Sequence, residues 1–201
     1  EIHSFAHYEN GIIELDETGF RQGTDGSVTA RLHYDTATRA LRGTMNIDRM
    51  DVQALLALAN QKEDRLTGQI TSVVRLGGTL DNPSISLTGE IAEGARASYP
   101  VRDVALDVTL ADRVLTVRKL AGEQGGGSFS AVGTVDFDGL ANVDVTGTDI
   151  ALGIFTRFAG VEEDVTGTTS LTLHIGGHTQ NPEADLMMTA KNGGARGASF
   201  D

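Results

Sequence analysis

The sequence predicts a mainly all-β protein, folded as a long antiparallel curled sheet with one apolar face. First, most of the chain alternates apolar and polar residues with a period of two, which is the pattern of half-buried strands. Second, Gly, Asn and Asp residues separate these stretches, and glycine accounts for 25 of the 201 residues. Third, the whole pattern occurs twice, as in repeat proteins. Together these features are typical of a turn-rich β chain.

An internal repeat divides the chain in two. Its landmarks are a Thr-Gly, a Gly-Gly and an Asn-Pro pair, found at Thr67-Gly68, Gly77-Gly78 and Asn82-Pro83 and again 99 residues later at Thr166-Gly167, Gly176-Gly177 and Asn181-Pro182. We therefore predict two copies of one unit, at residues 1–99 and 100–201. Because the chain begins at Glu1 without a signal peptide, we expect it to be a continuous excerpt of a longer protein.

The alternating positions define one apolar face, which is the candidate lining of a groove. In the first copy it is formed by Ile13, Leu15, Val28, Leu32, Met45, Ile47, Val74, Leu76, Ile85 and Leu87. In the second copy it is formed by Val104, Leu106, Val108, Leu110, Val143, Val145, Leu171, Leu173, Ile175 and Leu186. The copies agree on this face, with Met45 and Ile47 matching Val143 and Val145. A slip of one residue would turn all these side chains to water, so the register is strongly specified.

One segment in each copy breaks the strand pattern. Apolar residues recur at helical spacing after Asp51 and again after Asp149, and aspartate is a favourable N-cap. We predict two short helices, near residues 51–60 and 149–159. Both are too short to be stable alone, so each must pack on the sheet. We expect them to cover an end or an edge, where an exposed strand would invite unwanted pairing.

The shape of the sheet follows from the number of strands. About seven strands in each copy, about fourteen in all, would make a sheet roughly 65 Å wide. A sheet of that width must twist, curl, split or close. A sandwich would bury the apolar face against itself, whereas a trough would leave it open as a groove. The pattern of residues is compatible with both.

Composition and motifs exclude several classes of function. A net charge of −12 argues against binding to nucleic acid, and the absence of cysteine excludes thiolate catalysis and Cys-based zinc sites. The five histidines, His174 among them, have no ligand partners at metal spacing and fit a solvated surface. Gly125-Gly126-Gly127 and Asp136-Phe137-Asp138-Gly139 lack the residues of a phosphate or calcium loop, so we predict turns. We find no catalytic residues and predict no metal and no cofactor.

Three stretches carry a resemblance to a known family. They are LTGQITSVVRLGGTLDNPSISLTG from Leu66, VRDVALDVTLADRVLTVRKL from Val101 and GGSFSAVGTVDFDG from Gly126. With their recurrence in both copies, they are similar to the TamB group of AsmA-like proteins, named for the inner-membrane component of the translocation and assembly module. The resemblance extends over essentially the whole chain. It is a similarity of pattern, without a catalytic signature.

The resemblance implies a fold, a place and a function. The fold would be a β-taco, a trough with a hydrophobic inner groove. The chain would be a periplasmic segment of a protein anchored in the inner membrane, and its groove would conduct phospholipid acyl chains between the inner and outer membranes and support outer-membrane biogenesis. An outer-membrane barrel of the TamA/BamA type would be a partner, through parts outside this chain. The alternative is a structural or interaction module, either an adhesin-like solenoid or a chaperone-like groove for outer-membrane protein strands.

Overall fold

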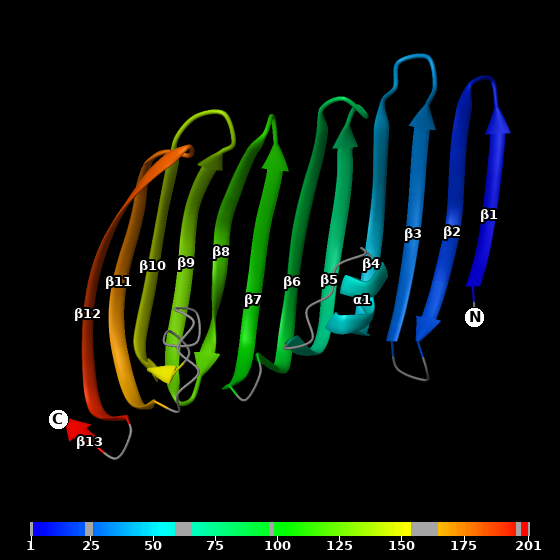
Figure 1. Cartoon of the computed structure of the whole chain (residues 1–201). Helices are drawn as coiled ribbons and strands as arrows, with labels where there is room; N and C mark the ends of the chain where they lie inside the picture. Colours follow the sequence, from blue (N-terminus) through cyan, green and yellow to red (C-terminus); the bar gives the residue numbers. More distant parts are fainter. Residues whose placement is uncertain are drawn as a thin grey trace.

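The chain forms one continuous antiparallel sheet. The computed structural model describes residues 2–22, 26–58, 66–96, 99–153, 165–195 and 198–200. Within these residues thirteen strands lie side by side in the order of the sequence, each hydrogen-bonded to its neighbours in the chain (Figure 1). The predicted fold class, a mainly all-β long antiparallel curled sheet, is confirmed. The described residues form one strand fewer than the roughly fourteen expected.

From the second strand on, the strands of the two halves of the sheet have closely similar lengths. The first six are β1 (Ile2–Glu9), β2 (Ile12–Gln22), β3 (Gly26–Asp35), β4 (Leu41–Asp51), β5 (Leu66–Gly78) and β6 (Pro83–Arg96). The next six are β7 (Tyr99–Ala111), β8 (Val114–Gln124), β9 (Gly127–Asp136), β10 (Ala141–Ala151), β11 (Thr166–His178) and β12 (Asn181–Ala195). The short strand β13 (Ala198–Phe200) follows.

Tight two-residue turns join several of the hairpins. Asn10 and Gly11, between β1 and β2, have φ angles of 50° and 83°, and the corresponding pair Asp112 and Arg113 has 50° and 62°. Positive φ at both central residues is the geometry that suits a two-residue hairpin loop. Gly125 and Gly126 form the same kind of loop between β8 and β9. The glycine run is therefore a turn, as predicted.

The Asn-Pro pairs mark the starts of strands, as their chemistry requires. Pro83 opens β6 and Asn181 opens β12. The preceding Gly78 has a φ of 79°, and a Cβ placed there would lie 2.3 Å from the carbonyl oxygen of Asn82. Only glycine fits that position without displacing the backbone. Proline has no N–H to donate, and the first position of a strand tolerates this loss.

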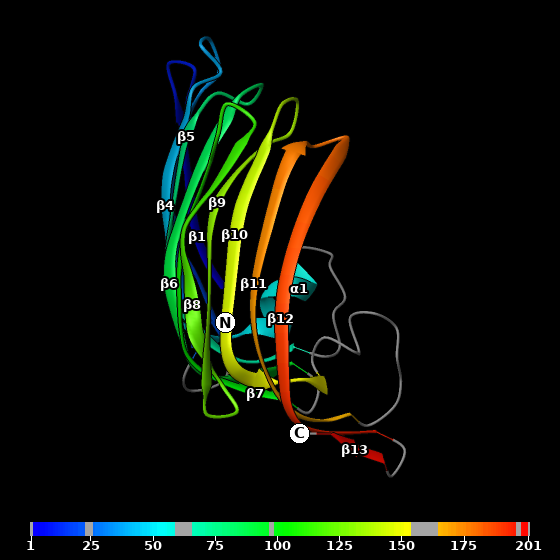
Figure 2. The same cartoon turned by 90° about the vertical axis from the view of Figure 1, so that its left-hand side faces the viewer.

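Bulges bend the strands at equivalent places in the two repeats. One extra residue is inserted in β4 between Ile47 and Met50, and one in β10 between Gly147 and Ile150. The residues at these bulges, Arg49 and Asp149, have φ angles of 45° and 50°. Bulges increase twist and bend the strand that carries them. In edge view the strands curve along their length, which gives the sheet its trough shape (Figure 2).

Helix α1 (Val52–Leu58) lies on the inner side of this curve. The backbone N–H of Ala54 donates to Oδ1 of Asp51 at 3.1 Å, so Asp51 is the N-cap that the sequence predicted. The helix packs on the internal strands β4 and β5, so of the two expected positions, an end or an edge of the sheet, the edge is wrong. Its apolar residues Ala54 and Leu55 need apolar partners, and these lie on the inner face of the sheet.

The second predicted helix lies mostly outside the described residues. Asp149 belongs to strand β10 and is the bulge residue that corresponds to Arg49, so it is not an N-cap. Gly153 has helical backbone, and residues 154–159 lie outside the described residues. The expected N-cap is displaced because the number of residues that separates corresponding positions of the two repeats differs from strand to strand. Met45, for example, corresponds to Val145 and not to Val143. Met45 faces Val74 and Val145 faces Leu173, and Val74 and Leu173 are equivalent positions of the two repeats.

Candidate functional site

The register of the sheet brings all the predicted groove residues to one face. Directly opposed residues of antiparallel strands point to the same side. One row of such pairs crosses the sheet from Val28 through Ile47, Ser72, Gly89, Leu106, Leu120, Ala131, Val145 and Leu173 to Leu186. We call this side the inner face, because helix α1 packs on it.

Two further rows run parallel to the first. One contains Ala30, Met45, Val74, Leu87, Val108, Val117, Gly133, Val143, Ile175 and Ala184. The other contains Leu15, Leu32, Gly43, Leu76, Ile85, Leu110, Leu115, Val135 and Ala141. Ile13 faces Tyr34 and Val104 faces Ile91 at the margins of this area. No charged residue lies in any of the three rows, and Ser72 is the one polar side chain in them, so the face is almost wholly apolar.

The inner face is only partly covered. Of the predicted groove residues, Ile47, Val74, Val104 and Leu171 are buried, Leu186 is 58% exposed, and the rest keep intermediate exposure. Every described strand belongs to the same sheet, so among the described residues no second sheet packs on this face. A sandwich is thus not formed, and the apolar surface is that of a trough.

A hollow of about 1010 Å³ lies over strands β1 to β5. Its lining includes the inner-face residues Leu15, Phe20, Val28, Leu32 and Leu76. Most of its lining residues, Glu14, Arg31, His33, Arg42 and Arg75 among them, belong to the outer face, because the sheet is a single layer at this end. The hollow is therefore mainly a feature of the polar face, and the case for the apolar groove depends on the rows of the inner face.

At equivalent positions of the inner face the two repeats carry their large side chains on different strands. In the first repeat, the neighbouring strands β4, β5 and β6 place three residues of the inner face directly opposite one another at one level: Ile47, Ser72 and Gly89. The corresponding residues are Gly147, Leu171 and Met188. A Cβ at Gly147 would lie 2.6 Å from the side chain of Ile150, so that position has no room for a larger residue. Each repeat thus fills the same level with a different distribution of large and small side chains.

Sequence reasoning missed some inner-face residues. Strand β8 contributes Leu115, Val117 and Leu120, and β2 contributes Phe20. In both strands a bulge shifts the alternation by one residue, so the apolar pattern changes phase midway. A search for two short alternating stretches out of phase by one position would have found them.

The outer face is polar and carries cross-strand contacts between basic and acidic side chains. Arg118 contacts Asp107 at 2.7 Å, His174 contacts Asp144 at 2.8 Å and His33 contacts Glu14 at 3.0 Å. His174 is therefore paired as well as exposed, which refines the predicted solvated surface. Among the residues that the structure describes, no group of three His, Cys, Asp or Glu side chains could hold a metal ion.

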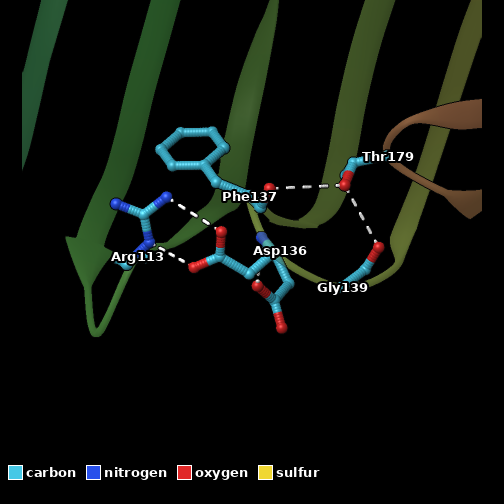
Figure 3. A network of polar contacts seen from close by, with 6 residues as sticks. Arg113, Asp136, Phe137, Gly139 and Thr179 are labelled. Carbon is cyan, nitrogen blue, oxygen red and sulfur yellow. Dashed lines mark hydrogen bonds and ion pairs between the residues drawn. The ribbon is translucent and has the colours of Figure 1, made fainter.

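The predicted turn after β9 is stabilised by polar contacts at one end of the sheet (Figure 3). Arg113 donates two hydrogen bonds to the carboxylate of Asp138, and the backbone N–H of Asp138 donates to Asp136 at 2.9 Å. The hydroxyl of Thr179 donates to the carbonyl of Gly139 at 3.1 Å and so ties the next hairpin to this turn. These contacts occupy the carboxylates in the turn, which acts as a hairpin connection and not as a calcium loop.

We predict a measurable pKa change in this turn. Hydrogen bonds from Arg113, and then its positive charge, lower the pKa of Asp138. The pair thus stabilises the fold above the ordinary pKa of aspartate, and this contribution is lost as the pH falls through the lowered value. Arg113→Gln should raise the pKa of Asp138 toward its ordinary value, as measured by carboxyl ¹³C NMR. An unchanged pKa would show that the pair does not form in solution.

Comparisons with known proteins add no family to these observations. In the described part of the chain no helix has the length and hydropathy needed to cross a membrane. No protein-family model matches the chain, and no curated protein or solved structure is significantly similar to it.

Proposed function

We propose that the inner face binds the acyl chains of phospholipids and conducts them along the sheet, as a segment of a TamB-like periplasmic protein. The observation that carries the proposal is the set of three uncharged apolar rows that cross the strands of both repeats. An acyl chain gains about 0.8 kcal/mol for each CH₂ removed from water and needs no specific polar contact. A continuous apolar surface is therefore sufficient to bind it.

The arrangement also favours an acyl chain that moves along the inner face over one that stays bound at a single place. The rows cross neighbouring strands, which are about 4.8 Å apart, so the apolar surface extends for roughly 45 Å. The side chains are a mixture of Leu, Val, Ile, Met and Ala, with few polar atoms that could hold a headgroup at one place. A chain on such a surface can slide with little change in free energy. The protein would act as a non-enzymatic carrier between inner and outer membranes.

The charge of the protein agrees with this role. The net charge is −12, and the charged side chains lie outside the three apolar rows. A polar, acidic outer face keeps a protein with a large apolar surface in solution. In the longer protein this segment would belong to the periplasm, with the membrane anchor and the contact to an outer-membrane barrel supplied by other parts.

Lipid extraction from the purified protein tests the proposal. We expect organic extraction and mass spectrometry to recover phosphatidylethanolamine or phosphatidylglycerol from protein expressed in a Gram-negative host. After delipidation the protein should bind a pyrene-labelled phospholipid. If the delipidated protein ignores this probe but binds a peptide with the alternating pattern of an outer-membrane strand, the chaperone-like alternative is correct. Binding of neither would contradict both functions.

A further inference from the structure

The hollow over strands β1 to β5 is basic, although the chain as a whole is acidic. Four arginines and two carboxylates line it, an excess of two positive charges, whereas the net charge of the chain is −12. These charged residues are Arg21, Arg31, Arg42, Arg75, Glu14 and Asp16. Four of the 16 basic residues thus gather in one place on the outer face. A local excess of positive charge in a concave surface attracts anionic ligands.

Three of these arginines surround Thr44, and we call the four residues the arginine patch. Thr44 of β4 lies directly opposite Arg31 of β3 and Arg75 of β5, and these three strands are neighbours (Figure 1). Arg42 is two residues from Thr44 on the same strand, so its side chain points to the same face. All three arginines are exposed. Because adjacent strands are only about 4.8 Å apart, the long arginine side chains can reach one ligand above Thr44.

The contacts of the patch leave its guanidinium groups able to bind a ligand. Nη2 of Arg42 donates to Nε2 of His33 at 3.3 Å, and Nδ1 of His33 donates to Oε1 of Glu14 at 3.0 Å. Glu14 therefore contacts His33 and not Arg42, and Arg42 keeps N–H donors for a ligand, since a guanidinium has five. Arg75 has no hydrogen bond or ion pair among the described residues. A guanidinium that is already held in position loses less entropy when an anion binds.

The second repeat forms the same strands without the arginine patch. Because Met45 corresponds to Val145, the ladders define the equivalent residues. In place of Arg31, Arg42, Thr44 and Arg75 the second repeat has Val132, Asn142, Asp144 and His174. The sheet therefore does not require the three arginines. Like charges that lie close together on a sheet are destabilising, and a bound anion would offset this cost.

We propose that the arginine patch binds a soluble organic phosphate that carries two or more negative charges. Its phosphate group would lie over Thr44, between the guanidinium groups of the three arginines. The planar fork of arginine forms paired, charge-assisted hydrogen bonds with phosphate oxygens. The hydroxyl of Thr44 supplies a further donor beneath them. Three positive charges around one point favour a multiply charged group over a single carboxylate.

The structure favours a small soluble ligand over a lipid headgroup or an acidic peptide. The arginine patch and the apolar rows lie on opposite faces of a single-layered sheet. A lipid whose acyl chain lies on the inner face therefore cannot place its headgroup on the patch. Of the lining residues on the outer face, Phe5 alone has a large apolar side chain, whereas peptide partners usually need several such anchors. The volume of about 1010 Å³ is that of a small-molecule site. Binding at this patch is independent of the proposed lipid groove.

An NMR titration with inorganic pyrophosphate tests the proposal. In the wild-type chain pyrophosphate should shift the Nε–Hε signals of Arg42 and Arg75 and the amide signal of Thr44. The amide signals of the equivalent residues Asn142 and Asp144 should not move. Arg75→Gln should weaken binding by about tenfold, because one charge-assisted contact is lost. Arg75→Lys keeps the charge without the planar fork and should restore part of the affinity.

Arg118→Gln is the matched control. Arg118 is also exposed on the outer face, but it lies on β8 and contacts Asp107 at 2.7 Å. The variant has the same net charge as Arg75→Gln and should bind pyrophosphate like the wild type. Equal weakening in both variants, or equal shifts with sodium chloride at the same ionic strength, would show that only the overall charge matters and would overturn the proposal.

Two further results would also overturn it. One is the absence of any shift with pyrophosphate. The other is binding to phosphatidylglycerol vesicles that depends on Arg42 and Arg75 while pyrophosphate does not bind, which would assign the patch to a membrane surface. The backbone amide spectrum checks the fold of each variant. If Arg75→Gln does not fold, Arg42→Gln tests the same site with the same expected loss.

Discussion

Leu173→Glu is expected to weaken phospholipid binding by at least about tenfold while leaving the melting temperature within a few degrees of the wild type. Leu173 lies in the middle of an inner-face row, between Val145 and Leu186. A carboxylate there meets the acyl chain, and an unpaired charge against an apolar ligand costs several kcal/mol. The fold tolerates the change because Leu186 next to it is 58% exposed, so the carboxylate reaches water.

Thr172→Glu is the matched control. Thr172 is the preceding residue of the same strand, and it points to the outer face, where it opposes Thr146 and Met187. The variant has the same net charge as Leu173→Glu, so general repulsion of anionic lipid is the same in both. It is a better control than His174→Glu, which would place a second carboxylate beside Asp144. Binding of the pyrene-labelled phospholipid should fall only in Leu173→Glu. An equal loss in both variants, or in neither, would place the binding site elsewhere.

The fold class and the apolar face could be predicted from the sequence because both depend on short-range alternation. In an antiparallel meander each strand pairs with its neighbours in the chain, so the order of strands needs no long-range information. The period of two then decides which residues share a face. This is why Leu15 and Leu186, at opposite ends of the sheet, could be placed on the same side before their pairing was known.

The positions of the bulges and of the helix cannot be predicted from the sequence pattern. A bulge adds one residue to one strand without any change of composition, so Asp149 was interpreted as an N-cap although it is the bulge residue of β10. The same insertions hid Val117 and Leu120 from the apolar face. The position of helix α1 depends on where the curve of the sheet leaves apolar surface exposed, which is a property of the assembled sheet. Of the two positions expected for it, an end or an edge of the sheet, the edge is therefore wrong, and the helix lies on the inner face.

A charge should affect stability differently in two parts of the inner face: little where the face is open to water, and strongly where helix α1 covers it. Met50→Asp tests the covered part. Met50 is fully buried and packs with Ile47 and Val74 in a cluster that Ala54 and Leu55 of helix α1 help to cover. The substitution removes the buried thioether side chain and puts a carboxylate where the helix separates it from water. Both changes destabilise the fold, so the free energy of unfolding should fall by at least about 4 kcal/mol.

Urea unfolding of three variants decides whether α1 seals this end of the trough. Met187→Asp makes the same chemical change at a methionine that is 79% exposed, and its free energy of unfolding in dilute solution should stay within about 0.5 kcal/mol of the wild type. Met50→Leu keeps the volume and should cost less than about 1.5 kcal/mol. If Met50→Asp costs no more than Met50→Leu, the carboxylate has reached water. In that case α1 does not cover the face in solution, and the open trough extends under the helix to the bulge of β4.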